Sequence, residues 1–528
     1  MPKMRTLIAA VIVLSLLSPA FSQTESKVKI DPALFVYLKE CRAIMRAVGN
    51  DIWKGWDLAK TPILFYRPHV QDILIAYPHQ PAGFQVLTGF NPLGGETIYY
   101  RDGTTFIEYD GQNTVTDIDG VKTLVVADTF SNQRNQLNGV LLGRDKDFAQ
   151  TWLENWNFLP NDPYAQMAMI LHEGFHAFQA AQAPDKGPNE TAAIDYPLLD
   201  PTNNSSWALE AALMRDALLS ESRDTRAAKI RELVAVRTER RAALKKEAVD
   251  YEDLTEYLEG LAKYIEFRFL KEAQALEPDP RLFFINGFYG FGPKLKETSD
   301  KTIKQIKDII AASIDMTGNK FGVGPLRFRL YSSGAALALL LDDVAADWKA
   351  DIFKGGVYLF DKLKKAVPLS AAEQASLVSQ AKNEYGYETL FKEKRRFEEE
   401  GRKVLDDKLR NILETRDTLV VLDFSDLGGI IGMAFTPFGV SKVAENLTIY
   451  DMVPLAGRFA NRAEFRFAKV IPVLVDKAAK QMKFVVKTKP SNIEAQKGNE
   501  IKIEEFSLTG SRYEVKSTGN KVLVKLLK

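Results

Sequence analysis

The sequence predicts an α+β fold in which a predominantly helical region lies between a small N-terminal sheet and a β-rich C-terminal region. Short runs rich in β-branched and aromatic residues, separated by turn signals such as Asp102-Gly103, occupy residues 61–128. Apolar residues at helical spacing dominate from Asp162 onward, and the pattern returns to strands at Thr418. The expected segments are an N-terminal leader at 1–22, a helix and small sheet at 23–150, the helical region at 151–417 and the β-rich region at 418–528.

The N-terminal region begins with a helix and continues with strands. Residues 31–58 carry apolar side chains at helical spacing, including Leu34, Leu38 and Cys41. Asp119-Gly120 provides another turn signal. The four runs that we expect to be strands are Ile63–Tyr66, Ile73–Ala76, Thr97–Tyr100 and Leu124–Val126.

Helical patterns fill the middle of the chain. Asp162 is a good N-cap residue, Pro163 suits the first turn, and Pro184 stops the helix that they begin. The many charges of both signs between Arg223 and Lys246 are typical of a solvated helix surface. Further helical patterns cover residues 205–248, 252–276, 301–315, 331–349 and 370–415.

Two later stretches have a different character. The aromatic, glycine-rich stretch Phe283–Phe291 fits either a wall of a cleft or packing in the core. In the C-terminal region, Gly519-Asn520 fits a hairpin turn. The runs expected to be strands there include Phe484–Val486, Ile501–Ile503 and Val522–Val524.

The first 22 residues have the pattern of a secretory signal. Lys3 and Arg5 precede an apolar stretch from Leu7 to Leu17 that is too short to span a membrane, and the small residues before Gln23 favour cleavage between Ser22 and Gln23. We therefore expect a secreted or periplasmic protein that is not membrane-bound after cleavage. Cleavage changes the net charge from +1 to −1, which gives no reason to expect nucleic acid as a partner.

A metal-binding pattern stands in the middle helix. Only four histidines occur in the chain, and two of them lie in the pentapeptide His172-Glu173-Gly174-Phe175-His176. On a helix, residues i and i+4 share one face, so both imidazoles can reach one zinc ion with Glu173 beside them. This pattern predicts a zincin-like catalytic domain in the helical region.

The third zinc ligand is a choice between two glutamates. No histidine follows His176, and His69 and His79 both look like loop or strand-end residues. A carboxylate is expected instead, as in sites with two histidines and one glutamate. Glu210 lies along an apolar stripe and therefore needs a cation or hydrogen-bond partners. Glu259 shares a helical face with Glu256, a pattern that is typical of an exposed acidic face.

Two segments resemble those of gluzincin metallopeptidases, distantly those of aminopeptidase N-like enzymes. Glu259-Gly260-Leu261-Ala262-Lys263-Tyr264-Ile265-Glu266 matches every defined position of their ligand-bearing helix, and Tyr331-Ser332-Ser333-Gly334-Ala335 is similar to their tyrosine segment. The resemblance implies that Glu259 is the zinc ligand, Glu266 an outer helper and Tyr331 the phenol that stabilises the oxyanion. Ser333 stands where the family has lysine, and the family's segment for holding a free amino terminus is absent, so aminopeptidase specificity does not follow.

These observations predict a zinc metallopeptidase in which Glu173 is the general base for a water molecule that attacks the peptide carbonyl. Its partner would be a peptide or protein substrate. Two alternatives remain: a zinc hydrolase of a non-peptide amide or ester, and a non-catalytic protein with a structural or vestigial zinc site that binds a cell-envelope partner. The sequence indicates neither the cleavage specificity nor the oligomeric state.

Overall fold

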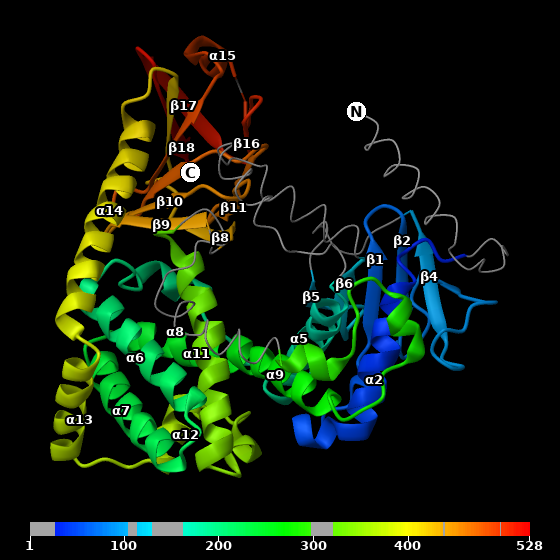
Figure 1. The fold of residues 1–528 in the computed structure, drawn as a ribbon. Coiled ribbons are helices and arrows are strands. Elements are labelled where there is room, and N and C mark those ends of the chain that lie inside the picture. The colour runs from blue at the N-terminus through cyan, green and yellow to red at the C-terminus, as the bar shows by residue number, and fades with distance from the viewer. Residues whose placement is uncertain (1–26, 104–112, 129–161, 297–319, 437–438, 497) are drawn as a thin grey trace, which may run out of the picture. The chain divides into compact units, whose positions relative to one another are not determined.

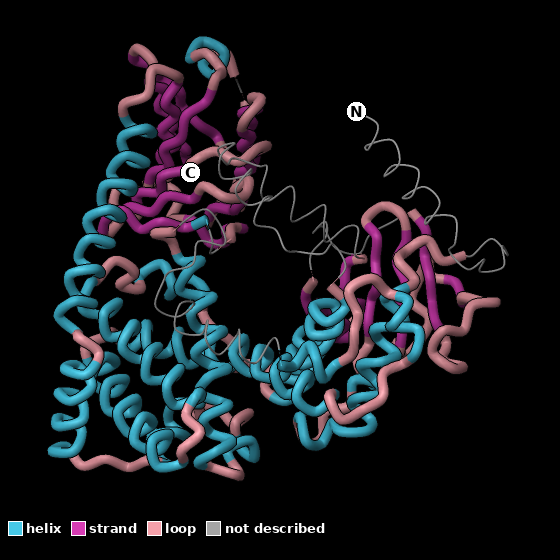
Figure 2. Tube along the Cα trace, viewed as in Figure 1, coloured by secondary structure: helices cyan, strands magenta, loops and turns pink. Residues whose placement is uncertain are grey.

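The computed structural model describes residues 27–103, 113–128, 162–296, 320–436, 439–496 and 498–528. It has a mixed α and β fold, with sheets and a helical region, as predicted (Figures 1 and 2). The chain divides into two compact units, one formed by residues 1–177 and 276–290 and the other by residues 178–275 and 291–528. The predicted signal segment and the helical pattern at 301–315 lie outside the described residues.

The first unit contains the predicted N-terminal helix and sheet. Helix α2 spans Ala33–Ile52, and the sheet has the strand order β3-β4-β2-β1-β6-β5. Its core includes Leu64, Leu74 and Val125. The strands are β1 (Ile63–Arg67), β2 (Gln71–Ile75), β3 (Gln85–Val86), β4 (Ile98–Asp102), β5 (Thr114–Ile118) and β6 (Val121–Ala127).

All four predicted strand runs of this region are confirmed, and two strands were missed. Strand β3 is only two residues long, and β5 is the largely polar sequence Thr-Val-Thr-Asp-Ile, so neither has a strong apolar pattern. The predicted turn Asp119-Gly120 joins β5 to β6, with φ angles of 46° and 80°. Positive φ at both residues is the geometry of a two-residue hairpin, which explains this dipeptide.

Helix α5 spans Pro163–Gln182 and has the predicted ends. The Asp162 carboxylate accepts hydrogen bonds from the backbone N–H groups of Tyr164 (2.9 Å) and Ala165 (3.2 Å), as an N-cap does. Residues up to Ala177 belong to the first unit and the rest of the helix to the second. One continuous helix therefore serves both units.

The second unit begins with helices, and two of the helical patterns expected there are interrupted. The pattern expected at 205–248 forms α6, α7 and the start of α8. Ser220 ends α6, and Ser222 caps α7 by accepting a hydrogen bond from the Thr225 N–H at 3.4 Å. Gly386, with a φ of 62°, similarly interrupts the pattern expected at 370–415. The helices are α6 (Pro201–Leu219), α7 (Arg223–Ala242), α8 (Lys246–Thr255), α9 (Leu261–Ala273), α11 (Val323–Val344), α12 (Leu359–Ala366), α13 (Ala371–Glu384) and α14 (Tyr387–Leu413).

Short helical turns connect several of these helices. A π-helical turn, η3, spans Glu256–Gly260 and joins α8 to α9. The 3-10 turn η2 spans Glu190–Asp195. The remaining 3-10 turns are η1 (Leu58–Lys60), η4 (Pro280–Phe284) and η5 (Trp348–Asp351).

The strands predicted after Thr418 are present in the second unit, in two sheets, with α14 running alongside them (Figures 1 and 2). The sheet orders are β17-β18-β7-β14-β13-β10-β9 and β15-β16-β12-β11-β8. Gly519-Asn520 makes the predicted two-residue hairpin between β17 and β18. Together with a short helix, α15 (Pro490–Glu494), the strands are β7 (Thr418–Asp423), β8 (Ile430–Ala434), β9 (Val440–Ala444), β10 (Leu447–Tyr450), β11 (Ala456–Phe459), β12 (Glu464–Phe467), β13 (Val473–Asp476), β14 (Gln481–Val486), β15 (Glu500–Lys502), β16 (Phe506–Thr509), β17 (Arg512–Thr518) and β18 (Lys521–Leu527).

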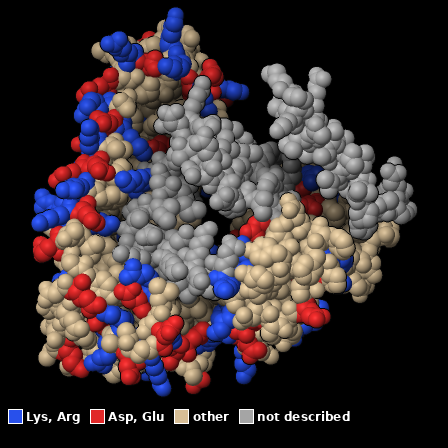
Figure 3. Space-filling view, viewed as in Figure 1, with Lys and Arg blue, Asp and Glu red and all other residues tan. Residues whose placement is uncertain are grey.

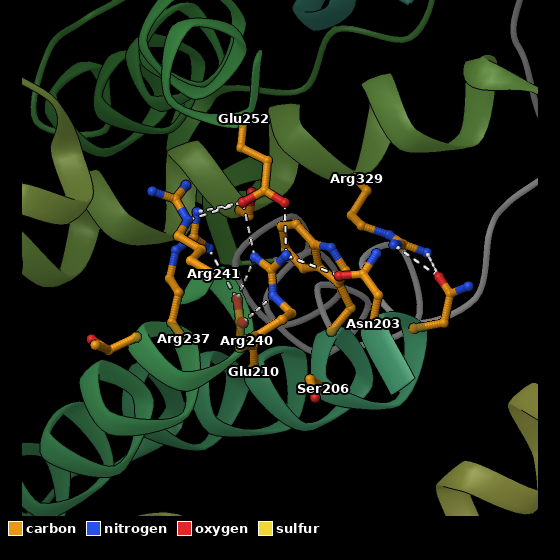
Figure 4. A network of polar contacts seen from close by, with 12 residues as sticks. Asn203, Ser206, Glu210, Arg237, Arg240, Arg241, Glu252 and Arg329 are labelled. Atoms are coloured by element: carbon orange, nitrogen blue, oxygen red, sulfur yellow. Dashed lines mark hydrogen bonds and ion pairs between the residues drawn. The ribbon is translucent and has the colours of Figure 1, made fainter. Parts of the chain in front are cut away.

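The expectation that the charges of α7 form a solvated surface is wrong for one face of that helix. Arg237, Arg240 and Arg241 are buried and share buried carboxylates from α6, α8 and η3 (Figure 4). The three arginines can face inward because carboxylates of α6, α8 and η3 neutralise their charges. The carboxylates are Glu210, Glu252, Asp253 and Glu256.

The described surface carries charges of both signs. On the face seen in Figure 3, positive and negative side chains are interspersed, in keeping with the net charge of +1. None of the helices that the structure describes is long and apolar enough to cross a bilayer.

Candidate metal centre

The two motif histidines lie on one face of α5. The centroids of the His172 and His176 rings are 4.7 Å apart. Both side chains and that of Glu173 are half-buried, whereas Gly174 and Phe175 are buried. The helix therefore turns its histidines and the glutamate toward accessible space and the rest of the motif toward the core.

The buried half of the motif fixes α5 on the N-terminal unit. The Phe175 ring packs edge-on against Trp53 at 4.9 Å and Trp56 at 5.3 Å. A Cβ atom at Gly174 would lie 2.8 Å from Cδ1 of Leu58, so this position favours glycine. The two variable positions of the motif thus have packing roles.

Glu256 and Glu259 both lie in the π turn η3, and the geometry of this turn points their side chains in different directions. In an α-helix, residues three apart lie about 60° apart around the axis. A π turn has more residues per turn and widens this angle to about 115°. The expected shared acidic face is therefore wrong: Glu256 points into the arginine network, and Glu259 pairs with Arg327 of α11.

The glycines of the two resembling segments contact each other. A Cβ atom built on Gly260 would lie 2.5 Å from Cα of Gly334, and one built on Gly334 would lie 2.8 Å from Cα of Gly260. Helix α11 and the π turn can approach this closely only because both positions lack a side chain. The close approach brings Tyr331, one turn before Gly334, toward Glu259.

His172, His176 and Glu259 form one group in the structure. Each offers a ligand atom, and these atoms all lie within 4.8 Å of one another. Gln179, three residues after His176, explains the approach: its amide donates to the carbonyl oxygens of Tyr257 at 2.8 Å and Leu258 at 3.2 Å. The end of α5 is thereby fixed on the π turn that carries Glu259.

Glu210 lies elsewhere, in the arginine network. Its side chain is fully buried and accepts hydrogen bonds from Arg237 at 3.1 Å and from Arg240 at 2.5 Å. The prediction that this buried carboxylate needs a cation is confirmed. Of the two glutamates considered as the third ligand, the structure brings only Glu259 to the histidines.

The network also explains the serine that replaces lysine in the tyrosine segment. Ser333 is fully buried and donates a hydrogen bond to Glu256, which Arg237 also contacts at 2.6 Å. The charge of Arg240 and its neighbours holds the pKa of Glu252 well below its usual range, although burial alone would raise it. The Glu252 carboxylate is therefore charged at neutral pH, and the network joins α7 to α8 and, through Glu256 of η3, to α11.

Tyr331 lies beside Glu259 and Arg327. Burial, and next the negative charge of Glu259, raise the pKa of the Tyr331 phenol. The guanidinium of Arg327 lies 5.8 Å from the centre of the phenol ring. A phenol with a raised pKa stays protonated at neutral pH and can donate a hydrogen bond.

Sequence reasoning missed Arg327 and its second partner, Glu190. The Arg327 Nη2 atom lies 2.5 Å from Oε1 of Glu259, and Nη1 forms an ion pair with Glu190 of η2. Arg327 precedes Tyr331 by four residues on the same helix, so the i−4 spacing was a usable signal for it. Glu190 lies in a short 3-10 turn after α5 and carries no such signal.

The other candidate residues take no part in this group. His69 and His79 are exposed, in a turn and in a loop, as predicted, and Cys41 is buried in the first unit. Glu266, the expected outer helper, accepts a hydrogen bond from Lys263 at 2.6 Å.

The stretch Phe283–Phe291 combines packing and exposure. Phe288 stacks on Tyr164 with ring centres 5.1 Å apart and is buried, as is Phe291. Phe284 is 87% exposed. Part of the stretch is therefore core, and part presents aromatic rings to solvent.

Comparison with known proteins found no matching family model, no matching curated protein and no matching solved structure.

Proposed function

We propose that this protein is a zinc-dependent hydrolase that cleaves peptide bonds with Glu173 as the general base. One observation carries the proposal: the ligand atoms of His172, His176 and Glu259 lie within 4.8 Å of one another, and Glu173 follows His172 on the same half-buried part of α5. The resemblance to gluzincin segments supports the same assignment. The predicted signal segment would place the reaction in the periplasm or outside the cell.

The donor set fits zinc. Two imidazole nitrogens and one carboxylate oxygen are a common ligand set of catalytic zinc sites, which keep a fourth position open for water. With zinc–ligand distances of 2.0–2.2 Å, neighbouring ligands of a tetrahedral site are about 3.3 Å apart. The ligand atoms of this group all lie within 4.8 Å of one another. In the described part of the chain this group has three members, which is the usual number of protein ligands at a catalytic zinc site.

When bound, zinc would polarise the substrate carbonyl and make water more acidic. In the proposed mechanism, Glu173 accepts a proton from the attacking water and passes it to the leaving amine. Tyr331, whose raised pKa keeps the phenol protonated, donates a hydrogen bond to the oxyanion. His172, His176 and Glu259 would hold the ion, and Arg327 forms an ion pair with Glu259.

Metal content and turnover test this proposal together. Purified wild-type protein should contain about one zinc ion per chain. His176→Ala and Glu259→Gln should lose it, whereas His79→Ala, which changes an exposed loop histidine, should retain it. A wild-type protein without metal, or equal metal in all four proteins, would refute the site.

A second set of variants tests the general base. Glu173→Gln should retain zinc and lose nearly all hydrolysis of a peptide mixture, because the amide cannot accept the proton. Glu247→Gln makes the same substitution at an exposed position of α8 and should retain activity. Zinc with no turnover of peptides, amides or esters would favour the non-catalytic alternative, and turnover of esters or non-peptide amides alone would change the substrate class.

A further inference from the structure

We propose that Arg327 is a positioning residue that holds the Glu259 carboxylate for metal binding, and that Glu190 acts through Arg327. The inference rests on the proposed function, since it concerns Glu259 as a metal ligand. Three short polar contacts carry it, all between residues of the second unit.

The contacts form a chain from a buried tyrosine to the candidate ligand. Arg327 Nη2 donates to Oε1 of Glu259 at 2.5 Å, and Arg327 Nη1 donates to Oε1 of Glu190. The hydroxyl of Tyr251, a buried residue of α8, donates to the other oxygen, Oε2, of Glu190 at 3.3 Å. Each group that orients Glu259 is itself oriented by the next one.

The pairing leaves Glu259 able to bind a metal. A carboxylate has about four lone-pair sites on two oxygens, so a hydrogen bond to Oε1 does not exhaust its acceptor capacity. Partners of this kind hold metal ligands in one orientation, and their loss typically costs ~10–100-fold in metal affinity. Arg327 is well placed for this role because its side chain is only 14% exposed.

An arginine beside a hydrolytic site could instead bind a carboxylate of the substrate. Here the two terminal nitrogens of Arg327 already contact two different carboxylates. A third carboxylate would have to share a guanidinium whose single positive charge already pairs with two carboxylates, which weakens its attraction for another anion. The geometry therefore favours the holding of Glu259 over substrate recognition.

The negative charge of Glu190 lies next to the positive charge of Arg327. A guanidinium next to a metal ligand repels a divalent cation, and the repulsion is stronger at partly buried positions because the effective dielectric constant there is lower than in water. The ion pair with Glu190 offsets the positive charge of Arg327. We expect Glu190 to support metal binding mainly through Arg327, whose charge it offsets and whose guanidinium it orients.

A double-mutant cycle on the full-length protein tests this dependence. Zinc affinity is measured by competition with a chelator for wild type, Arg327→Met, Glu190→Gln and the double variant, with Arg281→Met as a control for loss of an exposed arginine ion pair. Arg327→Met and Glu190→Gln should each bind zinc ~10-fold or more weakly. In the Arg327→Met background, Glu190→Gln should change the affinity by less than about twofold.

Two further readouts separate positioning from a general loss of structure. The visible spectrum of the cobalt-substituted protein should change in Arg327→Met, because it reports the arrangement of the ligands, while the unfolding midpoint of the metal-free protein serves as the stability reference. Arg327→Lys should recover part of the affinity, because an ammonium group can pair with one of the two carboxylates.

The outcomes distinguish this inference from the proposed function. If wild type binds no zinc, or if His176→Ala binds it equally well, the proposed function fails first. If His176→Ala loses zinc but Arg327→Met keeps both wild-type affinity and the wild-type cobalt spectrum, only the role of Arg327 is refuted. An equal effect of Glu190→Gln with and without Arg327 would refute the dependence of Glu190 on Arg327.

Discussion

The contact between Gly260 and Gly334 makes a sharp prediction about the candidate site. In Gly334→Ala, the new Cβ atom would lie 2.7 Å from the carbonyl oxygen of Glu256 and 2.8 Å from Cα of Gly260. Both are backbone atoms, so no side-chain rotation relieves the contact. Helix α11 and the π turn must move apart instead.

The size of the effect follows from these distances. Ordinary contacts begin at 3.4 Å, so the two elements must separate by about 0.7 Å. Overpacking of this kind costs ~1–3 kcal/mol, and the higher helix propensity of alanine returns ~1 kcal/mol. We expect a net loss of up to about 2 kcal/mol in the free energy of unfolding. Zinc affinity should also fall, because Arg327 and Tyr331 on α11 move away from Glu259.

Urea unfolding and zinc titration measure the two effects. Gly292→Ala is the matched control, since a Cβ atom built at this helical position has no neighbour within 4 Å among the described residues. The control should therefore be near wild type in stability and in zinc binding. A Gly334→Ala protein with wild-type stability and zinc affinity would refute the close approach of α11 to the π turn.

Three other substitutions test other parts of the structure. Glu210→Gln removes the negative charge that two buried arginines share, so it should lower the free energy of unfolding by about 3 kcal/mol. Urea unfolding measures this loss, and retention of wild-type stability would contradict the buried network. Phe175→Ala should cost ~3–5 kcal/mol by opening a cavity beside Trp53 and Trp56, and a smaller loss in the same assay would show that the motif helix does not depend on this packing. Burial raises the pKa of Asp72 to about 6. Between about pH 4 and pH 6, Asp72 therefore holds a proton in the folded protein, whereas in the unfolded chain it has lost that proton. The free energy of unfolding should therefore decrease as pH rises through this window, by up to roughly 2–3 kcal/mol from this group. The unfolding midpoint of Asp72→Asn should change less steeply with pH than that of wild type. An unchanged slope would contradict the assignment of the raised pKa to Asp72.

Local rules were enough to predict much of the secondary structure. The N-cap at Asp162, the stop near Pro184 and the hairpin at Gly519-Asn520 depend on residues within a few positions of one another, and all three are present. The same rules failed at Ser220–Ser222, where a cap interrupts a continuous charged helical pattern. Periodicity does not register such a break, because the apolar spacing resumes on the far side of the cap.

Burial of charge was the larger failure. Residues 223–246 look solvated as a single helix, yet Arg237, Arg240 and Arg241 are buried because carboxylates from three other elements surround them. The pairing partners lie 11–30 residues away along the chain. No pattern within one helix contains that information.

In the candidate site, too, some residues could be predicted from the sequence and others could not. Helical periodicity alone places His172 and His176 together, since i and i+4 share a face, and Glu173 follows His172 directly in the sequence. The choice between Glu210 and Glu259 required the tertiary structure, because it depends on a π turn, on a glycine contact between α11 and that turn, and on the counter-charges that occupy Glu210. Chemistry between neighbours in one helix can be read from the sequence, whereas the pairing of groups far apart along the chain depends on how the helices pack.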